Sequence, residues 1–313
     1  MSRVAEYEHL YGPVPSRRLG RSLGIDMVPM KTCCFDCIYC QLGPTTCHTR
    51  ERKDYVDVDE VLRDLEDWLE AGGSADYLTF AGCGDPTLNI DLGDAMARAR
   101  ELSGIPVCLL TNGALLWRKG VRDAAMQADL IVPSLDAATP EVFEAINHPV
   151  ADITLDRYIE GLTETVQAFH GEVWLEVMLV AGVNDSDDEL AALANAIRAI
   201  APTEVQLNTV VRPAPGSDVQ RVDNGTLVRA RVILGPLATV ITSAWERGTP
   251  EGAEHSEAEV LSLVSYRPCT IEDVSNGLGM HPNEAIKYLQ HLISEGKLRR
   301  EDRDGQVFFV RPD

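Results

Sequence analysis

Between residues 58 and 210 the chain alternates two patterns of apolar positions. In VDEVLRDLEDWLEAGG, residues 58–73, apolar side chains recur every three or four positions and two glycines follow, which predicts a helix and its end. The next run, YLTFAG at 77–82, is short and mostly apolar, which indicates a buried strand. This couplet recurs, with further helices predicted at 91–102, 115–127, 155–169 and 187–200, and further strands at 105–110, 129–135, 172–180 and 204–210.

The alternation predicts an α/β fold on a parallel sheet, because parallel strands are joined by helical crossovers. SLGIDMV at 22–28 reads as an additional first strand, which brings the predicted strands to six. Six strands with covering helices fit a partial, open (β/α)6 barrel. In such sheets ligands gather at the carboxyl ends of the strands, so the residues that follow each strand are the first candidates for a site.

A change of composition late in the chain predicts a second, smaller domain. Residues 245–256 are polar and acidic and contain Gly and Pro, as linkers do, so we expect one domain over 1–244 and another over 257–313. The second domain shows three helical patterns and then a hairpin that turns at Asp304 and Gly305. This order resembles a winged helix-turn-helix domain.

The third helical pattern of this domain, at 282–294, gives little support to DNA binding. Lys287 is its only Lys or Arg, and the hairpin mixes basic with acidic residues. We therefore favour a module that packs on the barrel or contacts a protein or RNA partner.

The net charge of the chain limits the classes of partner that it can bind. The 313 residues carry a formal net charge of -21, so nonspecific binding to nucleic-acid phosphates requires a local concentration of Lys and Arg. Arg17, Arg18 and Arg21 form one such concentration. One interpretation is a solvated loop in which carboxylates pair with these arginines. The other is a functional role, in which they bind an anionic substrate or shield a metal cluster.

The sequence also favours a reducing compartment. No apolar run reaches the roughly 18 residues of a transmembrane helix, and the N-terminus lacks a signal-peptide stretch, so we expect a cytoplasmic protein without membrane contact. Of the eight cysteines, four fall within residues 33–40, which is a poor framework for disulfides. Reduced thiols remain available to bind metal.

Cys33, Cys37 and Cys40 have a C-x3-C-x2-C spacing, which is the most specific chemical signal in the chain. Three thiolates this close can hold three irons of a [4Fe-4S] cluster and leave the fourth iron open. A zinc knuckle usually needs a second pair of ligands, which is missing here. Inert buried cysteines are the remaining alternative, and a register that begins at Cys34 stays open.

The Cys motif resembles the signature of the radical S-adenosylmethionine (SAM) superfamily. AGCGDPT at 81–87 is similar to the turn that meets the amino group of SAM in that superfamily, and PSLDAA at 133–138 and LVAGVND at 179–185 resemble the strand ends that meet the ribose and the adenine. The opening PVPSRRLGRSLGI and the ending YCQLG narrow the resemblance to a subfamily of Fe-S oxidoreductases similar to archaeal wyosine tRNA-modifying enzymes.

The resemblance implies a set of residues that contact SAM. Asp85 stands where the superfamily usually has glutamate, so its reach toward the ammonium is one methylene shorter. For any single polar residue at a strand end, capping of the next helix remains an alternative. The implied contacts are Tyr39, Gly82, Gly84, Asp85, Pro86, Thr111, Asn112, Ser134, Asp136 and Asn184.

The activity implied by the resemblance is reductive cleavage of SAM, which starts radical chemistry on a substrate that the sequence does not identify. A tRNA base or other RNA, a small metabolite and a protein all remain open. An electron donor such as flavodoxin or ferredoxin is implied as a partner. The competing hypothesis is a winged-helix transcriptional regulator in which an Fe-S cluster senses redox state. The remaining cysteines, such as Cys83, are too scattered to suggest a second cluster.

Overall fold

The computed structural model describes residues 7–16, 18–211, 214, 218–241, 257–278, 280–303 and 305–312. Three features from the sequence lie outside these residues. They are Arg17, the linker at 245–256 and Asp304 of the hairpin turn.

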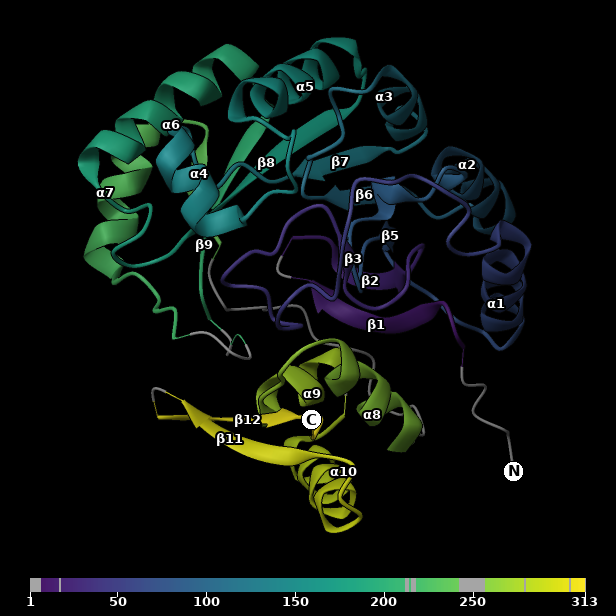
Figure 1. The fold of residues 1–313 in the computed structure, drawn as a ribbon. Coiled ribbons are helices and arrows are strands. Elements are labelled where there is room, and N and C mark those ends of the chain that lie inside the picture. Colours follow the sequence, from purple (N-terminus) through teal and green to yellow (C-terminus); the bar gives the residue numbers. More distant parts are fainter. Residues whose placement is uncertain are drawn as a thin grey trace.

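An eight-stranded sheet forms the centre of the fold (Figure 1). The first pair of strands is antiparallel, and every other pair is parallel. The order across the sheet is β1 (Leu10–Ser16), β2 (Gly20–Ile25), β5 (Tyr77–Phe80), β6 (Val107–Thr111), β7 (Leu130–Pro133), β8 (Glu172–Leu179), β9 (Glu204–Thr209) and β10 (Ala238–Val240). β2 and β5 to β9 are the six predicted strands, so the partial barrel is confirmed.

The two outermost strands were not predicted. β1 contains Pro13 and Pro15, which weaken a strand pattern although an edge strand tolerates them, and β10 has only three residues. The first predicted strand, 22–28, begins and ends earlier than expected, at Gly20 and Ile25.

Helices form a layer on the outside of the curved sheet (Figure 1). The five predicted helices correspond to α1, α2, α3, α5 and α6, while α4 and α7 are additional. The bounds are α1 Val58–Glu70, α2 Leu92–Ser103, α3 Lys119–Ala125, α4 Pro140–Asn147, α5 Leu155–Ala168, α6 Asp187–Ile200 and α7 Asn224–Leu234, with a short 3-10 helix at Pro86–Leu88. No helix in the described part of the chain is long and apolar enough to cross a membrane.

The two faces of the sheet differ in polarity. Residues that face the helices, such as Ile25, Phe80 and Leu207, belong to the large hydrophobic core. The inner face carries polar residues on β2, β5, β8 and β9, and Ser22 Oγ lies 2.6 Å from Thr79 Oγ1 there. Parallel strands are usually apolar on both faces, so the polar part of the inner face indicates space for a polar ligand.

The turn between β1 and β2 folds against this inner face. Leu19 packs against Cys108, Leu130 and Val132. Arg18 Nη2 forms an ion pair with Glu176 Oε1 at 3.1 Å. Of the three arginines near the N-terminus, Arg18 therefore belongs to the inside of the barrel.

The C-terminal part forms its own hydrophobic cluster and packs on the barrel (Figure 1). Val14 of β1 joins this cluster, and both α8 and α9 contact β1. Three helices and a hairpin follow in the predicted order, whereas the winged-helix assignment and the domain boundaries stay predictions. The elements are α8 Glu257–Tyr266, α9 Ile271–Leu278, α10 Pro282–Ser294, β11 Arg299–Arg303 and β12 Gln306–Val310.

Candidate metal centre and cofactor site

A short pair of strands anchors the cysteine loop. β3 (Thr32–Cys33) pairs in parallel with β4 (Cys47–His48), and the loop between them carries the remaining cysteines of the motif. Backbone hydrogen bonds join this loop to the end of α4, from Ile38 N to the oxygen of Ile146 at 3.0 Å and from Asp36 N to the oxygen of Asn147 at 3.0 Å. The loop is thus held at the carboxyl ends of the strands.

Each sulfur of the motif accepts one hydrogen bond from a side-chain nitrogen. Asn112 Nδ2 donates to Cys33 Sγ at 3.3 Å, and Asn147 Nδ2 donates to Cys37 Sγ at 3.4 Å. Lys31 Nζ donates to Cys40 Sγ at 3.1 Å. These donors come from three separate segments, so the fold converges on the three thiols.

Burial disfavours the thiolate form of two cysteines of the motif. Burial raises the pKa of the Cys33 thiol to about 12, and burial also raises the pKa of the Cys37 thiol. A bound metal ion offsets this cost because it binds the thiolate directly.

Cys34 occupies a different environment from the other three cysteines of the loop. Its side chain has 0% exposure and belongs to the hydrophobic core. Cys47, on β4, is exposed. This arrangement favours the register that begins at Cys33 over the one that begins at Cys34.

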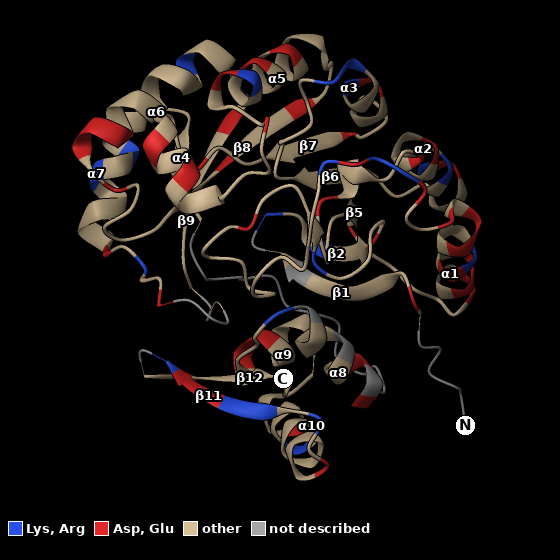
Figure 2. Cartoon of the chain, viewed as in Figure 1, with Lys and Arg blue, Asp and Glu red and all other residues tan. Residues whose placement is uncertain are grey.

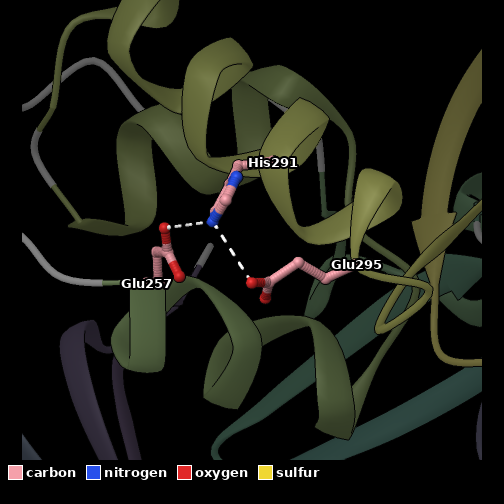
Figure 3. A group of neighbouring side chains, drawn as sticks. All are labelled: Glu257, His291 and Glu295. Carbon is pink, nitrogen blue, oxygen red and sulfur yellow. Dashed lines mark ion pairs between the residues drawn. The ribbon is translucent and has the colours of Figure 1, made fainter.

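The spacing of the sulfurs disfavours a single zinc ion. Zinc–sulfur bonds of about 2.3 Å place tetrahedral thiolate sulfurs about 3.8 Å apart. Within the described residues, one set of three His, Cys, Asp or Glu side chains has all its ligand atoms within 4.8 Å of one another, and it is Glu257, His291 and Glu295 (Figure 3). The three motif cysteines are spread more widely, as ligands of separate irons are.

Ion pairs account for the set in Figure 3. His291 Nε2 lies 3.2 Å from Glu257 Oε1 and 3.4 Å from Glu295 Oε1. Lys297 Nζ contacts the other oxygen of Glu295 at 2.7 Å, and this hydrogen bond lowers the pKa of Glu295. The lysine already neutralises the carboxylate that a metal ion would need.

The AGCGDPT turn packs against the first strand of the cysteine loop. A Cβ at Gly84 would lie 1.9 Å from the oxygen of Thr32, and a Cβ at Gly82, which has a φ of +117°, would lie 1.9 Å from Asp26 Oδ1. Asp85 N donates to the oxygen of Thr32 at 3.2 Å, and Pro86 begins the 3-10 helix. Glycine is required at both positions for the turn to reach the cysteine loop.

Asp85 accepts four hydrogen bonds from its own protein. Oδ1 accepts from the backbone nitrogen of Thr87 at 2.9 Å and from the Thr87 hydroxyl. Oδ2 accepts from Thr111 Oγ1 and from Asn112 N, both at 2.8 Å. The residue is 2% exposed, and burial raises the pKa of its carboxyl group.

Four acceptor positions are the capacity of a carboxylate. In this structure Asp85 therefore organises the turn and the Asn112 side of the cysteine site. Its predicted contact with the ammonium of SAM stays a prediction.

Asp136 lies at the centre of a second network, at the end of β7. Its Oδ2 accepts from the Tyr39 hydroxyl at 2.5 Å and from Asn147 Nδ2 at 2.9 Å, and its Oδ1 accepts from Met178 N at 2.9 Å. Burial raises the pKa of Asp136 to about 6. This network joins Tyr39 of the cysteine loop to β7 and β8.

Asn184 and Ser134 complete this edge of the sheet. Asn184 Nδ2 donates to the oxygens of Asp136 and Met178, both at 2.8 Å, while its Oδ1 accepts from Val180 N at 2.8 Å. The backbone of Ser134 bridges to β8, and its carbonyl accepts from the Tyr158 hydroxyl. Asn184 thus ties strand ends together, although the resemblance placed it against SAM.

The sequence-based interpretation missed Lys31 and Asn147. Lys31 lies two residues before the first motif cysteine, which was the only signal for it. Asn147 ends the unpredicted helix α4 and is 1% exposed, and in the part of the chain that the structure describes its buried Oδ1 has no hydrogen-bond partner. An orphaned acceptor beside the three sulfurs is the kind of group that a bound cofactor with hydroxyl or ammonium donors satisfies, so these residues fit a [4Fe-4S] cluster with SAM.

Comparisons with known proteins agree with this fit. The model of the radical SAM superfamily matches residues 27–194. A UPF0026 protein from Methanocaldococcus jannaschii is 30% identical over 96% of this chain and 95% of its own length. A protein named GTPase Obg from Brachyspira hyodysenteriae is 33% identical over 97% of this chain, which spans only 45% of that relative. The solved structure of a radical SAM methyltransferase from Sphaerobacter thermophilus shares the fold, with a TM-score of 0.55, 21% identity, and coverage of 70% of this chain and 65% of that one.

Proposed function

The chain belongs to the radical SAM superfamily, whose enzymes use a [4Fe-4S] cluster and SAM, and we propose that Cys33, Cys37 and Cys40 hold this cluster. The observation that carries the proposal is the convergence of one side-chain N–H donor on each of these three sulfurs. Cys34, within the hydrophobic core, takes no part in it.

When bound, the cluster and SAM supply a one-electron reductive cleavage that yields methionine and a 5'-deoxyadenosyl radical. The residues of the chain prepare the site for this reaction. Hydrogen bonds from Lys31, Asn112 and Asn147 stabilise the additional negative charge of the reduced state on the sulfurs. Protein groups otherwise bind, orient and exclude water.

The proposed SAM contacts fall into two roles. In the first role, residues contact SAM directly at the carboxyl ends of the strands. These are Tyr39, Ser134 and the backbone of the turn at 82–86. Asp85, Asp136 and Asn184 act through others, because their side chains bind Thr87, Thr111, Asn112, Tyr39, Asn147 and the strand ends. The unsatisfied Oδ1 of Asn147 is an additional acceptor for SAM.

The electron donor is proposed to dock beside the cysteine loop. Arg50 follows β4, which pairs with Cys33, and its backbone oxygen accepts from Arg118 Nη1 at 3.3 Å. Arg118 and Arg157 lie 5.0 and 5.4 Å from the ring centre of Trp117.

Basic and aromatic groups are thus concentrated here in a chain of net charge -21, whose helix α1, by contrast, is strongly acidic (Figure 2). Arg50 Nη2 also forms an ion pair with Asp152 Oδ2 at 2.8 Å, and Glu51 and Asp54 fall in the same stretch, so part of the positive charge is neutralised. The surface nevertheless suits an acidic electron carrier such as flavodoxin or ferredoxin, because complementary charge speeds encounter.

The decisive experiment is anaerobic reconstitution followed by reduction with dithionite in the presence of SAM. We expect about four irons per chain, from the cluster type, and formation of 5'-deoxyadenosine. If the protein binds the cluster and SAM but forms no 5'-deoxyadenosine, the proposed enzymatic activity is contradicted. The comparisons offer no support for the alternative, a redox-sensing regulator, and the same assay tests it.

A further inference from the structure

A cavity lies between the inner face of the barrel and the C-terminal part. Its volume is about 560 Å³, within the range of roughly 300–1,000 Å³ found for small-molecule sites. Gly82, in the turn beside the proposed SAM site, and Gln41, next to Cys40, also line it. The lining includes Thr79, Glu176 and Asn208 from the barrel and Arg267, Thr270 and Phe308 from the C-terminal part.

The charged groups on the barrel side, Glu176 and Arg18, are already paired. Glu176 accepts from Asn208 Nδ2 at 3.1 Å and forms an ion pair with Arg18 at 3.1 Å. Arg18 Nη1 also donates to Gln206 Oε1 at 3.0 Å. Arg18 is therefore occupied by the protein itself.

Arg267 differs from Arg18. It lies between α8 and α9 and is half-buried, and its Nε and Nη2 are buried without a hydrogen-bond partner among the described residues. Glu272 and Asp273 line the same cavity, but within the described residues neither forms an ion pair with Arg267, and Asp273 accepts from Thr270 N at 2.9 Å. Buried N–H donors without a partner are unfavourable, and an anion beside the guanidinium would offset this cost.

We propose that Arg267 binds a carboxylate or phosphate group of a small substrate that occupies this cavity. The planar guanidinium carries N–H donors at a spacing that matches two oxygens of such an anion. The inference rests on the proposed function, because the cavity takes a radical substrate only if SAM is cleaved beside it. The C-terminal part then forms one wall of the substrate site.

The test measures the melting temperature of the full-length, cluster-reconstituted protein with inorganic phosphate and, separately, with acetate, at an ionic strength held constant with sodium chloride. We expect at least one anion to raise the melting temperature by about 2 to 4 °C. Arg267→Met should abolish this rise, and Arg267→Lys should retain part of it. Arg229→Met is the matched control, because Arg229 is paired with Asp187 on the outer surface, and this variant should respond as the wild type does.

A second readout separates a ligand-binding role from a structural one. Without anion, Arg267→Met should melt at or above the wild-type temperature, because the unpaired guanidinium is lost. The proposal would be overturned if Arg267→Met melted below the wild type and if neither anion raised the melting temperature of the wild type. So would an equal response in wild type and Arg267→Met, which indicates an adventitious ion only.

The anion that acts identifies the chemistry of the substrate, since a response to phosphate alone indicates a phosphorylated substrate and a response to acetate alone a carboxylate. SAM cleavage by the wild type is measured independently of these shifts. Cleavage without anion binding rejects only the substrate site, and anion binding without cleavage rejects the proposed function.

Discussion

Asn147 lies 110 positions after Cys37 in the sequence, yet its Nδ2 donates to the sulfur of Cys37 at 3.4 Å. The same nitrogen donates to Asp136 Oδ2 at 2.9 Å. The helix α4, which ends at Asn147, thus connects the proposed cluster to the network of Asp136 and Tyr39. A change at this asparagine should affect the electronic properties of the cluster before it affects the fold.

Asn147→Ala should make the reduction potential of the cluster more negative. The hydrogen bond to sulfur favours the reduced state, and a preference of about 1 kcal/mol corresponds to about 40 mV for one electron. A redox titration followed by electron paramagnetic resonance measures the shift. Asn89→Ala is the control, because Asn89 is also buried but donates to the oxygens of Met27 and Val56 and not to sulfur. Equal potentials in wild type and Asn147→Ala would show that this contact does not tune the cluster.

Single Ala substitutions of Cys33, Cys37 and Cys40 should each remove most of the iron and the labile sulfide. Cys34→Ala should keep both and lower the free energy of unfolding by about 1 kcal/mol, because it removes a sulfur from the packed core. Iron and sulfide per chain are measured after anaerobic reconstitution. A folded Cys34→Ala protein without iron would show that the register begins at Cys34.

Asp85→Ala should lower the free energy of unfolding by about 3 kcal/mol or more. The change leaves the backbone nitrogens of the buried Thr87 and the half-buried Asn112 without their acceptor. Asp85→Glu should also be destabilised, since an additional methylene has to fit in a turn that is closed against Thr32. Urea unfolding and SAM titration are compared in the same preparations. If Asp85→Ala weakens SAM binding while its stability stays unchanged, the carboxylate contacts SAM directly.

Arg50→Glu should slow reduction by flavodoxin about tenfold and leave reduction by dithionite unchanged. The reversal places a negative charge on the proposed docking surface and so lowers the rate of encounter with an acidic carrier. Stopped-flow absorbance of the cluster measures both rates, and high salt should reduce the difference. Arg229 lies on the outer helix α7, so the cluster of Arg229→Glu should be reduced by flavodoxin at the wild-type rate. A similar slowing in both variants would indicate an effect of net charge instead of a docking surface.

The central strands could be predicted because their helix–strand couplets are regular and local. β1 could not, because its prolines are acceptable only at a sheet edge, and the sequence does not reveal which strand lies at the edge. The eight residues of α4 were too few for a helical pattern to be recognised.

In the candidate site, too, only features that depend on neighbouring residues in the sequence could be predicted. Cys33, Cys37 and Cys40 were recognisable from their spacing, which is a property of eight consecutive residues. The roles of Asn147 and Arg267 depend on which distant segments the fold brings together, and neither residue belongs to a motif. Asp85 was identified by its place in a motif, whereas its four internal hydrogen bonds became visible only in three dimensions.

The edge formed by β1 has a consequence for association between molecules. A sheet edge normally presents backbone N–H and C=O groups on which a strand of another chain can assemble. Pro13 and Pro15 have no N–H, and the pairing of β1 with β2 is irregular between Tyr11 and Val14. Both features discourage strand addition and aggregation at this edge. At the β1 edge the barrel therefore resists strand addition by a second copy of the chain without a closed ring of strands.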